Sequence, residues 1–414
     1  MAKSHLVCTD CNKSFEQEEV LYTCPHCGGN LDTQIDFHLN DLNLRPETIH
    51  ASRENSIWRY QALLPVNDPG FEHTPLHQVG WTPVYRPFQL RHELGLRDLW
   101  IKDESRNPSA SFKDRASAIV VAWTLQTNIQ TIVAASTGNA GAATACMAAS
   151  VGKEAIILAP RTAPPAKVAQ LLTYGAQVLL VDGTYDQAFD LSIEASQEFG
   201  WYNRNTGYNP FTVEGKKTAA LEIWEQVLYN LPESRGNLNV FIPVGDGNII
   251  SGLAKGFKDL LTLGWINRLP RLIGVQAEGS AAIAKAFAAG SSVIEPVHAE
   301  TIADSISVDL PRDGVRALRA VRESGGTFMT VSDAEILAAI PALGKAGLFV
   351  EPAGAAAYAG LVKAVSKSEL DPGTPALVLC TGSGLKDVRA ATMAVPAAPI
   401  IAPTLAALKK EIHA

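Results

Sequence analysis

The sequence NPSASFKDR, at residues 107–115, decides how the rest of this chain is interpreted. Its lysine, Lys113, follows two serines and stands where an extended segment, LWIKDES, gives way to a predicted helix. An amine that is held at a helix N-terminus and partly removed from water loses proton affinity and can form a Schiff base. The plainer interpretation is a helix start in which Ser111 is the cap and Asp114 and Arg115 are surface charges.

A second stretch, TIVAASTGNAGAA at residues 131–143, favours the chemical interpretation. It predicts an apolar strand, a turn of small residues and then a helix. Such a turn offers backbone N–H groups and hydroxyls to an anionic or planar ligand. Together the two stretches indicate a cofactor that needs both an amine and a close-fitting loop.

Strand and helix patterns alternate along most of the chain. The predicted strands are short apolar runs: LWIKDE, TIVAAS, EAIILAP, QVLLVDG, NVFIPVG, RLIGVQAE and PALVLCTG. Buried strands that alternate with helices predict an α/β fold with parallel sheets covered on both faces. Ligands in such sheets bind beyond the carboxyl ends of the strands. The candidate site loops all follow predicted strands.

The length and composition of the chain are typical of a packed enzyme rather than of a disordered chain. The 414 residues exceed what one hydrophobic core usually supports, so we expect two or three domains. The net charge of -7 argues against a general nucleic-acid binder. No stretch approaches the roughly 20 apolar residues that span a bilayer, and the N-terminus lacks a signal-peptide core. We therefore expect a cytoplasmic protein with no membrane or nucleic-acid partner.

The cysteines point to a metal. Cys8 and Cys11 form one CxxC pair, and Cys24 and Cys27 form another after twelve residues. Two such knuckles can place four thiolates tetrahedrally around zinc, and the cytoplasm disfavours disulfides. We predict a structural zinc site with these four ligands, although a redox pair, vestigial knuckles or a substitution by His26 remain alternatives. The other two cysteines, at positions 146 and 380, are expected in the core.

The motifs SFKDR, ASTGN, GKKT, PVGDGNIISG, EPAGAAA and CTGSGLKD occur in this order over residues 58–387. This set resembles threonine synthase and its close relatives, which are pyridoxal-phosphate enzymes of fold type II. The resemblance implies two three-layer domains with parallel sheets and an N-terminal zinc ribbon. It predicts the ribbon at residues 1–30, a connector at 31–79 and a catalytic body at 80–414. A mobile small domain is expected at about 120–205, and a homodimer is common in this fold.

The resemblance also assigns roles to individual residues. Lys113 would bind the cofactor and move protons on an amino-acid substrate. Asn139 would contact the ring hydroxyl, and the Thr381 hydroxyl would meet the ring nitrogen. The turn after the strand NVFIPV would hold the cofactor phosphate through Gly245, Asp246, Gly247, Asn248 and Ile249. The loop before Asn139 would hold the substrate carboxylate through Ser136, Thr137 and Gly138.

The substrate-phosphate cluster departs from the family pattern. Relative to Asn209-Pro210, Thr206 and Gly207 replace an Asn-Ser pair, and Thr212 replaces an arginine. Ala140 likewise replaces a threonine common in the ASTGN loop. A phosphate dianion without its arginine loses one of its strongest contacts. Either another cation reaches the site, with Arg204, Lys216 and Lys217 as candidates, or the substrate carries no phosphate.

Three functions follow from these observations. The first is the threonine synthase reaction, in which phosphate leaves the γ carbon of O-phosphohomoserine and water adds at the β carbon. The second is β-elimination or β-replacement on serine, threonine, O-phosphoserine or a related amino acid, as in a dehydratase or cysteate synthase. The third is a sensor built on an inactive body, which the presence of Lys113, Asn139 and Thr381 disfavours.

Overall fold

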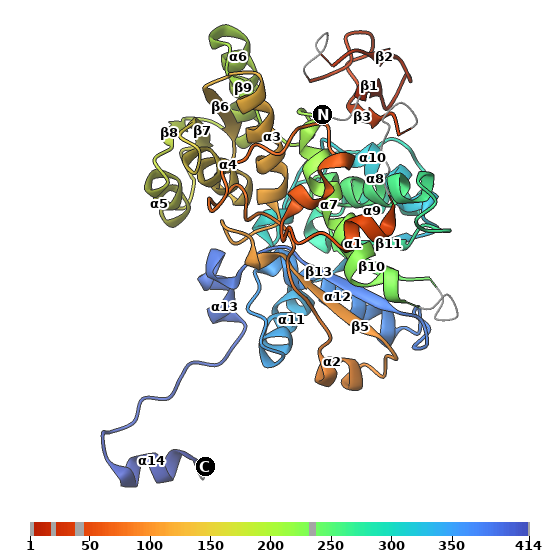
Figure 1. The fold of residues 1–414 in the computed structure, drawn as a ribbon. Helices are drawn as coiled ribbons and strands as arrows, with labels where there is room; N and C mark the ends of the chain where they lie inside the picture. The colour runs from red at the N-terminus through yellow and green to blue at the C-terminus, as the bar shows by residue number, and fades with distance from the viewer. Residues whose placement is uncertain (1–3, 18–21, 38–44, 232–236, 413–414) are drawn as a thin grey trace.

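A computed structural model describes residues 4–17, 22–37, 45–231 and 237–412 and contains three β-sheets (Figure 1). Residues 38–44 of the predicted connector lie outside the described ranges. The first sheet is antiparallel, with the order β2-β1-β3, and carries the N-terminal cysteines. Its strands are β1 (Ser4–Cys8), β2 (Ser14–Phe15) and β3 (Leu31–Ile35).

The second and largest sheet has the order β12-β11-β10-β13-β5-β4. Its strands are β4 (Val84–Tyr85), β5 (Leu99–Asp103), β10 (Asn239–Pro243), β11 (Arg271–Ala277), β12 (Thr327–Val331) and β13 (Ala376–Cys380). Strands β5 and β10 to β13 are parallel, whereas the edge strand β4 pairs antiparallel with β5. The expectation of purely parallel sheets is therefore wrong at this edge, where the two-residue β4 closes the sheet.

Both faces of the large sheet are covered because side chains alternate along buried strands. Val240 and Ile242 of β10 join a core with helices α7 to α10, while Phe241 joins a separate core with α2, α11 and α12. These helices are α7 (Phe211–Gln226), α8 (Asn248–Thr262), α9 (Ala282–Ala288), α10 (Gly314–Glu323), α2 (Phe88–Glu93), α11 (Asp333–Lys345) and α12 (Pro352–Ser366).

The third sheet is parallel with the order β8-β7-β6-β9, and all its strands fall within the predicted small domain. They are β6 (Thr131–Ala135), β7 (Glu154–Pro160), β8 (Gln177–Val181) and β9 (Tyr202–Asn203). The surrounding helices are α3 (Lys113–Gln126), α4 (Asn139–Ala149), α5 (Pro165–Thr173) and α6 (Tyr185–Phe199). Cys146 and Cys380 are buried in the cores, as predicted.

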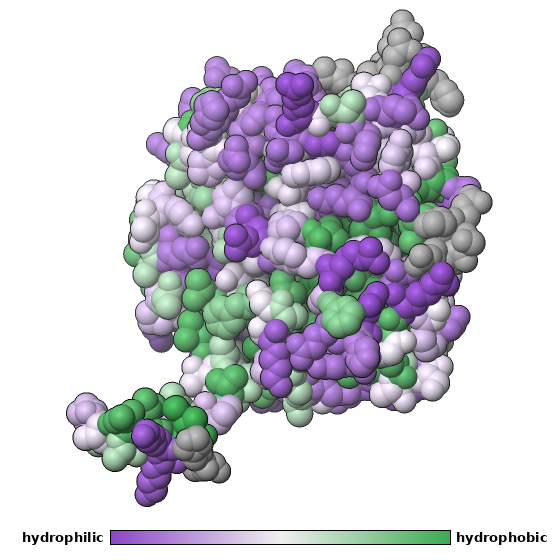
Figure 2. Space-filling view, turned by 60° about the horizontal axis from the view of Figure 1, so that its bottom comes forward, coloured by the Kyte–Doolittle hydropathy of each residue, from purple (hydrophilic) through white to green (hydrophobic). Residues whose placement is uncertain are grey.

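The remaining helices are short. They are α1 (Pro46–His50), η1 (Ile57–Leu63), η2 (Glu104–Arg106), η3 (Leu228–Asn230), η5 (Glu278–Ser280), η6 (Asp304–Ile306), η7 (Gly384–Lys386), α13 (Val388–Met393) and α14 (Leu405–Ile412). Helix α14 stands away from the body on an extended segment, and Figure 2 shows hydrophobic side chains along it. No helix within the described ranges combines the length and hydropathy required to cross a membrane.

Candidate active site

Lys113 is the first residue of α3. The preceding turn is held by Asp114, whose carboxylate accepts hydrogen bonds from the backbone N–H and the hydroxyl of Ser109. The N–H of Phe112 donates to the Thr381 carbonyl oxygen over 2.8 Å, which ties this turn to the end of β13. Lys113 therefore lies at the carboxyl edge of the large sheet, where ligands of parallel sheets bind.

The plainer interpretation of SFKDR as a surface helix start is wrong. Asp114 and Arg115 are both fully buried. The hydroxyl of Ser111 caps nothing: it is buried and has no hydrogen-bond partner among the described residues. A buried hydroxyl without a partner, one residue before Phe112 and two before Lys113, leaves a polar group free for a ligand.

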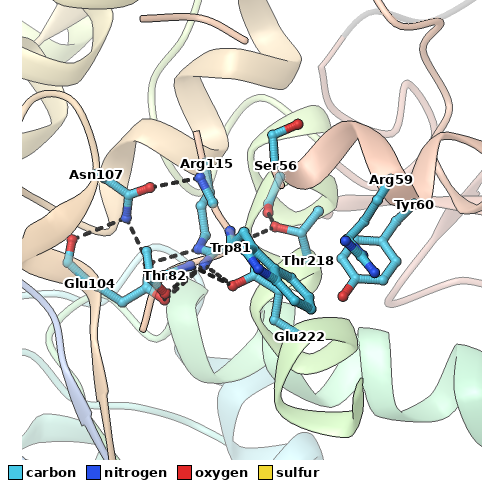
Figure 3. A network of polar contacts seen from close by, with 12 residues as sticks. Ser56, Arg59, Tyr60, Trp81, Thr82, Glu104, Asn107, Arg115, Thr218 and Glu222 are labelled. Atoms are coloured by element: carbon cyan, nitrogen blue, oxygen red, sulfur yellow. Dashed lines mark hydrogen bonds and ion pairs between the residues drawn. The ribbon is translucent and has the colours of Figure 1, made fainter. Parts of the chain in front are cut away.

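A buried ionic network fixes the helix that carries Lys113 (Figure 3). Arg115 bonds Glu104 from η2 over 2.7 Å and also bonds Glu222 from α7 with two of its nitrogens. Lys102 of β5 contacts Glu222 over 2.7 Å. Burial opposes ionisation of Glu222, but the charges of Arg115 and Lys102 outweigh it and lower its pKa to about 2. The network thus joins α3 to α7 and to the large sheet at Arg115, two residues after the lysine.

The surroundings of Lys113 make its amine a weak base. Burial lowers the pKa of Lys113, Glu351 opposes this effect with its negative charge, and the charge of Arg204 reinforces it. A lowered pKa increases the fraction of neutral amine, which is the nucleophilic form that condenses with an aldehyde.

The loop after β6 forms one wall of a cleft. Thr137, Gly138 and Asn139 line this cleft together with Glu351. Gly141 is required here, since a Cβ atom at this position would lie 2.1 Å from the Ser136 carbonyl oxygen. The Ser136 hydroxyl accepts the N–H of Gly138 over 3.2 Å, which closes the turn around the N-terminus of α4.

The structure brings Asn139 against a carboxylate that the sequence did not single out as a site residue. The Asn139 amide donates to both carboxylate oxygens of Glu351, over 2.9 and 3.0 Å, and lies 3.3 Å from the Ser305 hydroxyl. Burial raises the pKa of Glu351 against the opposing effects of Asn139 and Lys113. Glu351 is the first residue of the EPAGAAA motif, and its place in that motif was the signal by which the sequence could have identified it as a site residue.

The predicted phosphate turn lies between β10 and α8. Gly247 has φ +91°, and a Cβ atom there would approach the Asp313 carbonyl oxygen to 2.9 Å. The Asp246 carboxylate accepts the backbone N–H of Arg312 over 2.7 Å. Burial raises the pKa of Asp246 to about 6. Lys216 donates to the Asn248 side-chain oxygen at the start of α8.

The three cations offered for the missing arginine differ in their partners. Lys217 pairs with Glu214 over 2.6 Å and with Asp259 over 3.0 Å, so its charge is already neutralised. Within the described ranges, Arg204 and Lys216 form no ion pair with a carboxylate. Both are fully buried, which lowers the pKa of Lys216 far below its usual value and that of Arg204 to about 10.

Arg204 extends toward the altered cluster. Its Nε donates to Ser117, one helical turn after Lys113, over 3.1 Å, and its Nη1 donates to Thr206 over 2.8 Å. Its Nη2 is buried and finds no partner in the described part of the chain. Thr212 instead lies beside Asn248, 3.5 Å away, and its hydroxyl donates to the Asn209 carbonyl oxygen.

These residues fit pyridoxal phosphate. An amine of lowered pKa, a glycine turn at a helix N-terminus, and unpartnered polar atoms on Ser111 and Arg204 all follow the carboxyl ends of strands in the two parallel sheets. The cleft is bounded by both parallel-sheet units. Besides the bonds of Asn139 to Glu351 and Ser305, polar contacts cross it where Lys167 pairs with Asp304 and Lys386 donates to Gln170 over 3.2 Å.

The four N-terminal cysteines form a compact cluster. The Sγ atoms of Cys8, Cys11, Cys24 and Cys27 all lie within 4.8 Å of one another. The backbone N–H groups of Asp10 and Cys11 point to the Cys8 sulfur at 3.5 Å. Four thiols at this separation, with amides directed at one sulfur, suit a tetrahedral metal.

Comparison with known proteins agrees with this geometry. The model of the pyridoxal-phosphate dependent enzyme family matches residues 76–382. Threonine synthase from Methanocaldococcus jannaschii is 37% identical over 390 residues, covering 94% of each chain. Threonine synthase from Mycobacterium bovis is 34% identical, covering 89% of this chain and 99% of the relative.

Solved structures show the same fold. Threonine deaminase from T.th. superposes with a TM-score of 0.62 at 27% identity, covering 73% of this chain and 92% of the other. Diaminopropionate ammonia lyase from Escherichia coli gives a TM-score of 0.66 at 21% identity, covering 78% and 90%, which establishes the fold alone. This chain is a pyridoxal-phosphate-dependent enzyme and belongs to the threonine synthase family.

Proposed function

We propose that this protein converts O-phospho-L-homoserine and water into L-threonine and inorganic phosphate. Relatives that match most of the chain carry the name threonine synthase. The observation that carries the proposal is the buried Arg204 beside Lys113, which has no carboxylate partner among the described residues. A fully buried cation without a counter-charge calls for an anionic ligand.

The cofactor site would be built around Lys113, whose amine would hold the cofactor through its aldehyde. When bound, pyridoxal phosphate supplies an electron sink for carbanion chemistry at the amino acid. The turn Gly245–Asp246–Gly247–Asn248–Ile249 holds its phosphate through backbone N–H groups at the start of α8, assisted by Lys216. The neutral hydroxyl of Thr381 would hold the ring nitrogen, and Asn139 would hold the ring hydroxyl.

The substrate lies in the cleft with its carboxylate on the loop of Ser136, Thr137 and Gly138. Its phosphate lies against Arg204 and Thr206, while Thr212 supports the cofactor turn from the side of Asn248. This arrangement supplies a cation at the place where the family arginine is missing. The phosphate would also neutralise the charge that Arg204 leaves uncompensated in the free protein.

Proton transfer falls to Lys113 and Glu351. With its neutral amine, Lys113 would carry protons between carbons of the substrate. Glu351 has a raised pKa and lies within Coulombic range of Lys113, so it can return a proton to that amine or stabilise its charge. Loss of the α and β protons would precede departure of phosphate from the γ carbon. The γ carbon would then gain a proton to become the methyl group, water would add its hydroxyl at the β carbon, and the α carbon would be protonated again.

The deciding experiment mixes purified protein with O-phosphohomoserine and measures inorganic phosphate while identifying the amino acid formed. We expect phosphate and threonine in equal amounts. Altered residues at positions 206, 207 and 212 favour the other candidate, elimination or replacement at the β carbon of serine, threonine or O-phosphoserine. Release of ammonia and a keto acid from serine or threonine, without phosphate release from O-phosphohomoserine, would establish that candidate instead.

We also propose zinc as the metal of the cysteine cluster, on the basis of four sulfur ligands with no open position. A homodimer is proposed from the exposed apolar residues of the C-terminal segment, among them Ile400, Leu405 and Ile412. Metal analysis and light scattering of the purified protein test the two proposals.

A further inference from the structure

The cysteine cluster and the proposed cofactor turn contact the same short segment, which precedes and begins α10. From the cluster side, the Asn30 amide donates to the Arg312 carbonyl oxygen and to the Asp313 carboxylate, both over 3.2 Å. Both partner atoms are acceptors, so they fix the orientation of the amide. Asn30 follows Cys27 by three residues and is held by the other knuckle, since the Thr9 N–H donates to its carbonyl oxygen over 2.9 Å.

From the cofactor side, Asp313 is bonded through its other carboxylate oxygen. The Asn248 amide donates to this oxygen over 2.9 Å, and the Asn248 side-chain oxygen accepts from Lys216. The Asp313 backbone N–H donates to the Asp246 carbonyl oxygen over 3.1 Å. Asp313 is 1% exposed, so these bonds are protected from water and depend on one another.

The charge of Asp313 is balanced by a residue that the N-terminal sheet also holds. Arg316 contacts Asp313 over 3.1 Å and Asp32 of β3 over 2.7 Å. A displacement of β3 would therefore change both the hydrogen bond and the ion pair of Asp313.

A second contact reaches the segment that carries Arg204. Tyr22 lies two residues before Cys24 in the sequence. Its hydroxyl accepts a hydrogen bond from the Asn203 N–H over 2.9 Å. Its ring stacks on Tyr208 with 4.5 Å between the ring centroids. The N-terminal sheet thus touches both segments to which phosphate binding is assigned.

We infer that Asn30 is a positioning residue that links the metal-binding knuckles to the cofactor-phosphate turn, so that metal occupancy of the cysteine cluster sets the affinity for pyridoxal phosphate. The path runs from Asn30 through Asp313 and Asn248 to Lys216. It rests on the cofactor turn proposed above. A cluster without metal loses the bonds that fix the two knuckles, and Asn30 loses its fixed place against Asp313.

The test measures the dissociation constant of pyridoxal phosphate by equilibrium dialysis of the metal-loaded, cofactor-free protein. Asn30→Ala should weaken binding about tenfold, the loss expected for one bond to a buried charged group. Asn30→Asp has nearly the same shape but sets a carboxylate against Asp313, so it should weaken binding at least as much. The matched control is Arg319→Ala, which removes an exposed contact between α10 and the Thr9 carbonyl oxygen and should change the constant less than about twofold.

Metal removal completes the test. Chelation should weaken cofactor binding by the wild-type protein about tenfold. It should weaken binding by Asn30→Ala by less than about threefold, because chelation and the substitution disturb the same contact with Asp313 and their effects do not add. Asn248→Ala reports on the turn itself. If Asn248→Ala weakens binding and Asn30→Ala does not, or if chelation acts equally on both proteins, the inference is overturned while the cofactor turn stands. If neither variant weakens binding, both the proposed role of the turn in binding the cofactor phosphate and the inference about Asn30 are refuted.

Discussion

Replacing Arg204 with glutamine should have opposite effects on stability and on substrate use. In the free protein this guanidinium is 1% exposed and lacks a carboxylate partner within the described ranges. Burial lowers its pKa to about 10, which corresponds to about 3 kcal/mol of unfavourable free energy for the charged form. Glutamine removes that charge but also the bonds to Ser117 and Thr206, each worth about 1 kcal/mol. The free energy of unfolding should therefore stay constant or rise by about 1 kcal/mol.

Substrate use should fall, because the phosphate of O-phosphohomoserine would lose its buried cation. Removing one partner of a desolvated charge pair costs about 3 kcal/mol, or roughly 100-fold in kcat/KM. Binding of homoserine, which has no phosphate, should change little and is the control ligand. Arg204→Lys should recover part of the loss, since it keeps the charge but not the planar pair of donors.

The assay combines phosphate-release kinetics with O-phosphohomoserine, equilibrium binding of homoserine, and denaturant unfolding of the ligand-free protein. A variant that loses stability while kcat/KM stays within about threefold of wild type would mean that Arg204 supports the fold only. An equal fold-loss in kcat/KM for O-phosphohomoserine and in affinity for homoserine would also refute the reasoning, because it would show that the guanidinium does not contact the substrate phosphate.

Three further predictions concern the residues around the amine. Lys113→Ala should reduce turnover at least ~10³-fold while cofactor still binds through its phosphate, and a fully active variant would remove the basis of the proposed function. Glu351→Gln removes a charge that raises the pKa of Lys113, so the cofactor-free protein should capture the aldehyde with a midpoint at lower pH; an upward shift in a pH series would contradict this. Arg115→Leu leaves Glu104 buried without a cation and Glu222 with Lys102 alone among the described residues, and should cost about 3–5 kcal/mol of unfolding free energy at pH 7. In the wild type, the lowered pKa of Glu222 supplies stability above its unfolded pKa of about 4.3 that is lost as the pH falls toward about 2. The variant keeps Lys102 beside Glu222 and should show a smaller loss; unfolding curves that fall in parallel would oppose the assignment.

Much of the fold was available from the sequence because its signals are local. Buried parallel strands appear as short apolar runs, so all seven predicted runs coincide with strands, including the fully buried β10 and β13. Strand β12 was missed, since GTFMTV mixes polar and apolar residues at a half-covered position. The two-residue strands β4 and β9 are too short to produce a pattern.

The motif order by itself determined the family. It also predicted the amine of Lys113, the loop before Asn139 and the cysteine cluster, because each of these depends on residues close together in the chain. Only the tertiary structure decided which buried charges have an oppositely charged partner. Among the described residues it neutralised Lys217 with Asp259, left Arg204 without a carboxylate partner, and set Glu351 against Asn139 across 212 positions of sequence. Coulombic interactions and desolvation depend on distances in space, and no local pattern records them.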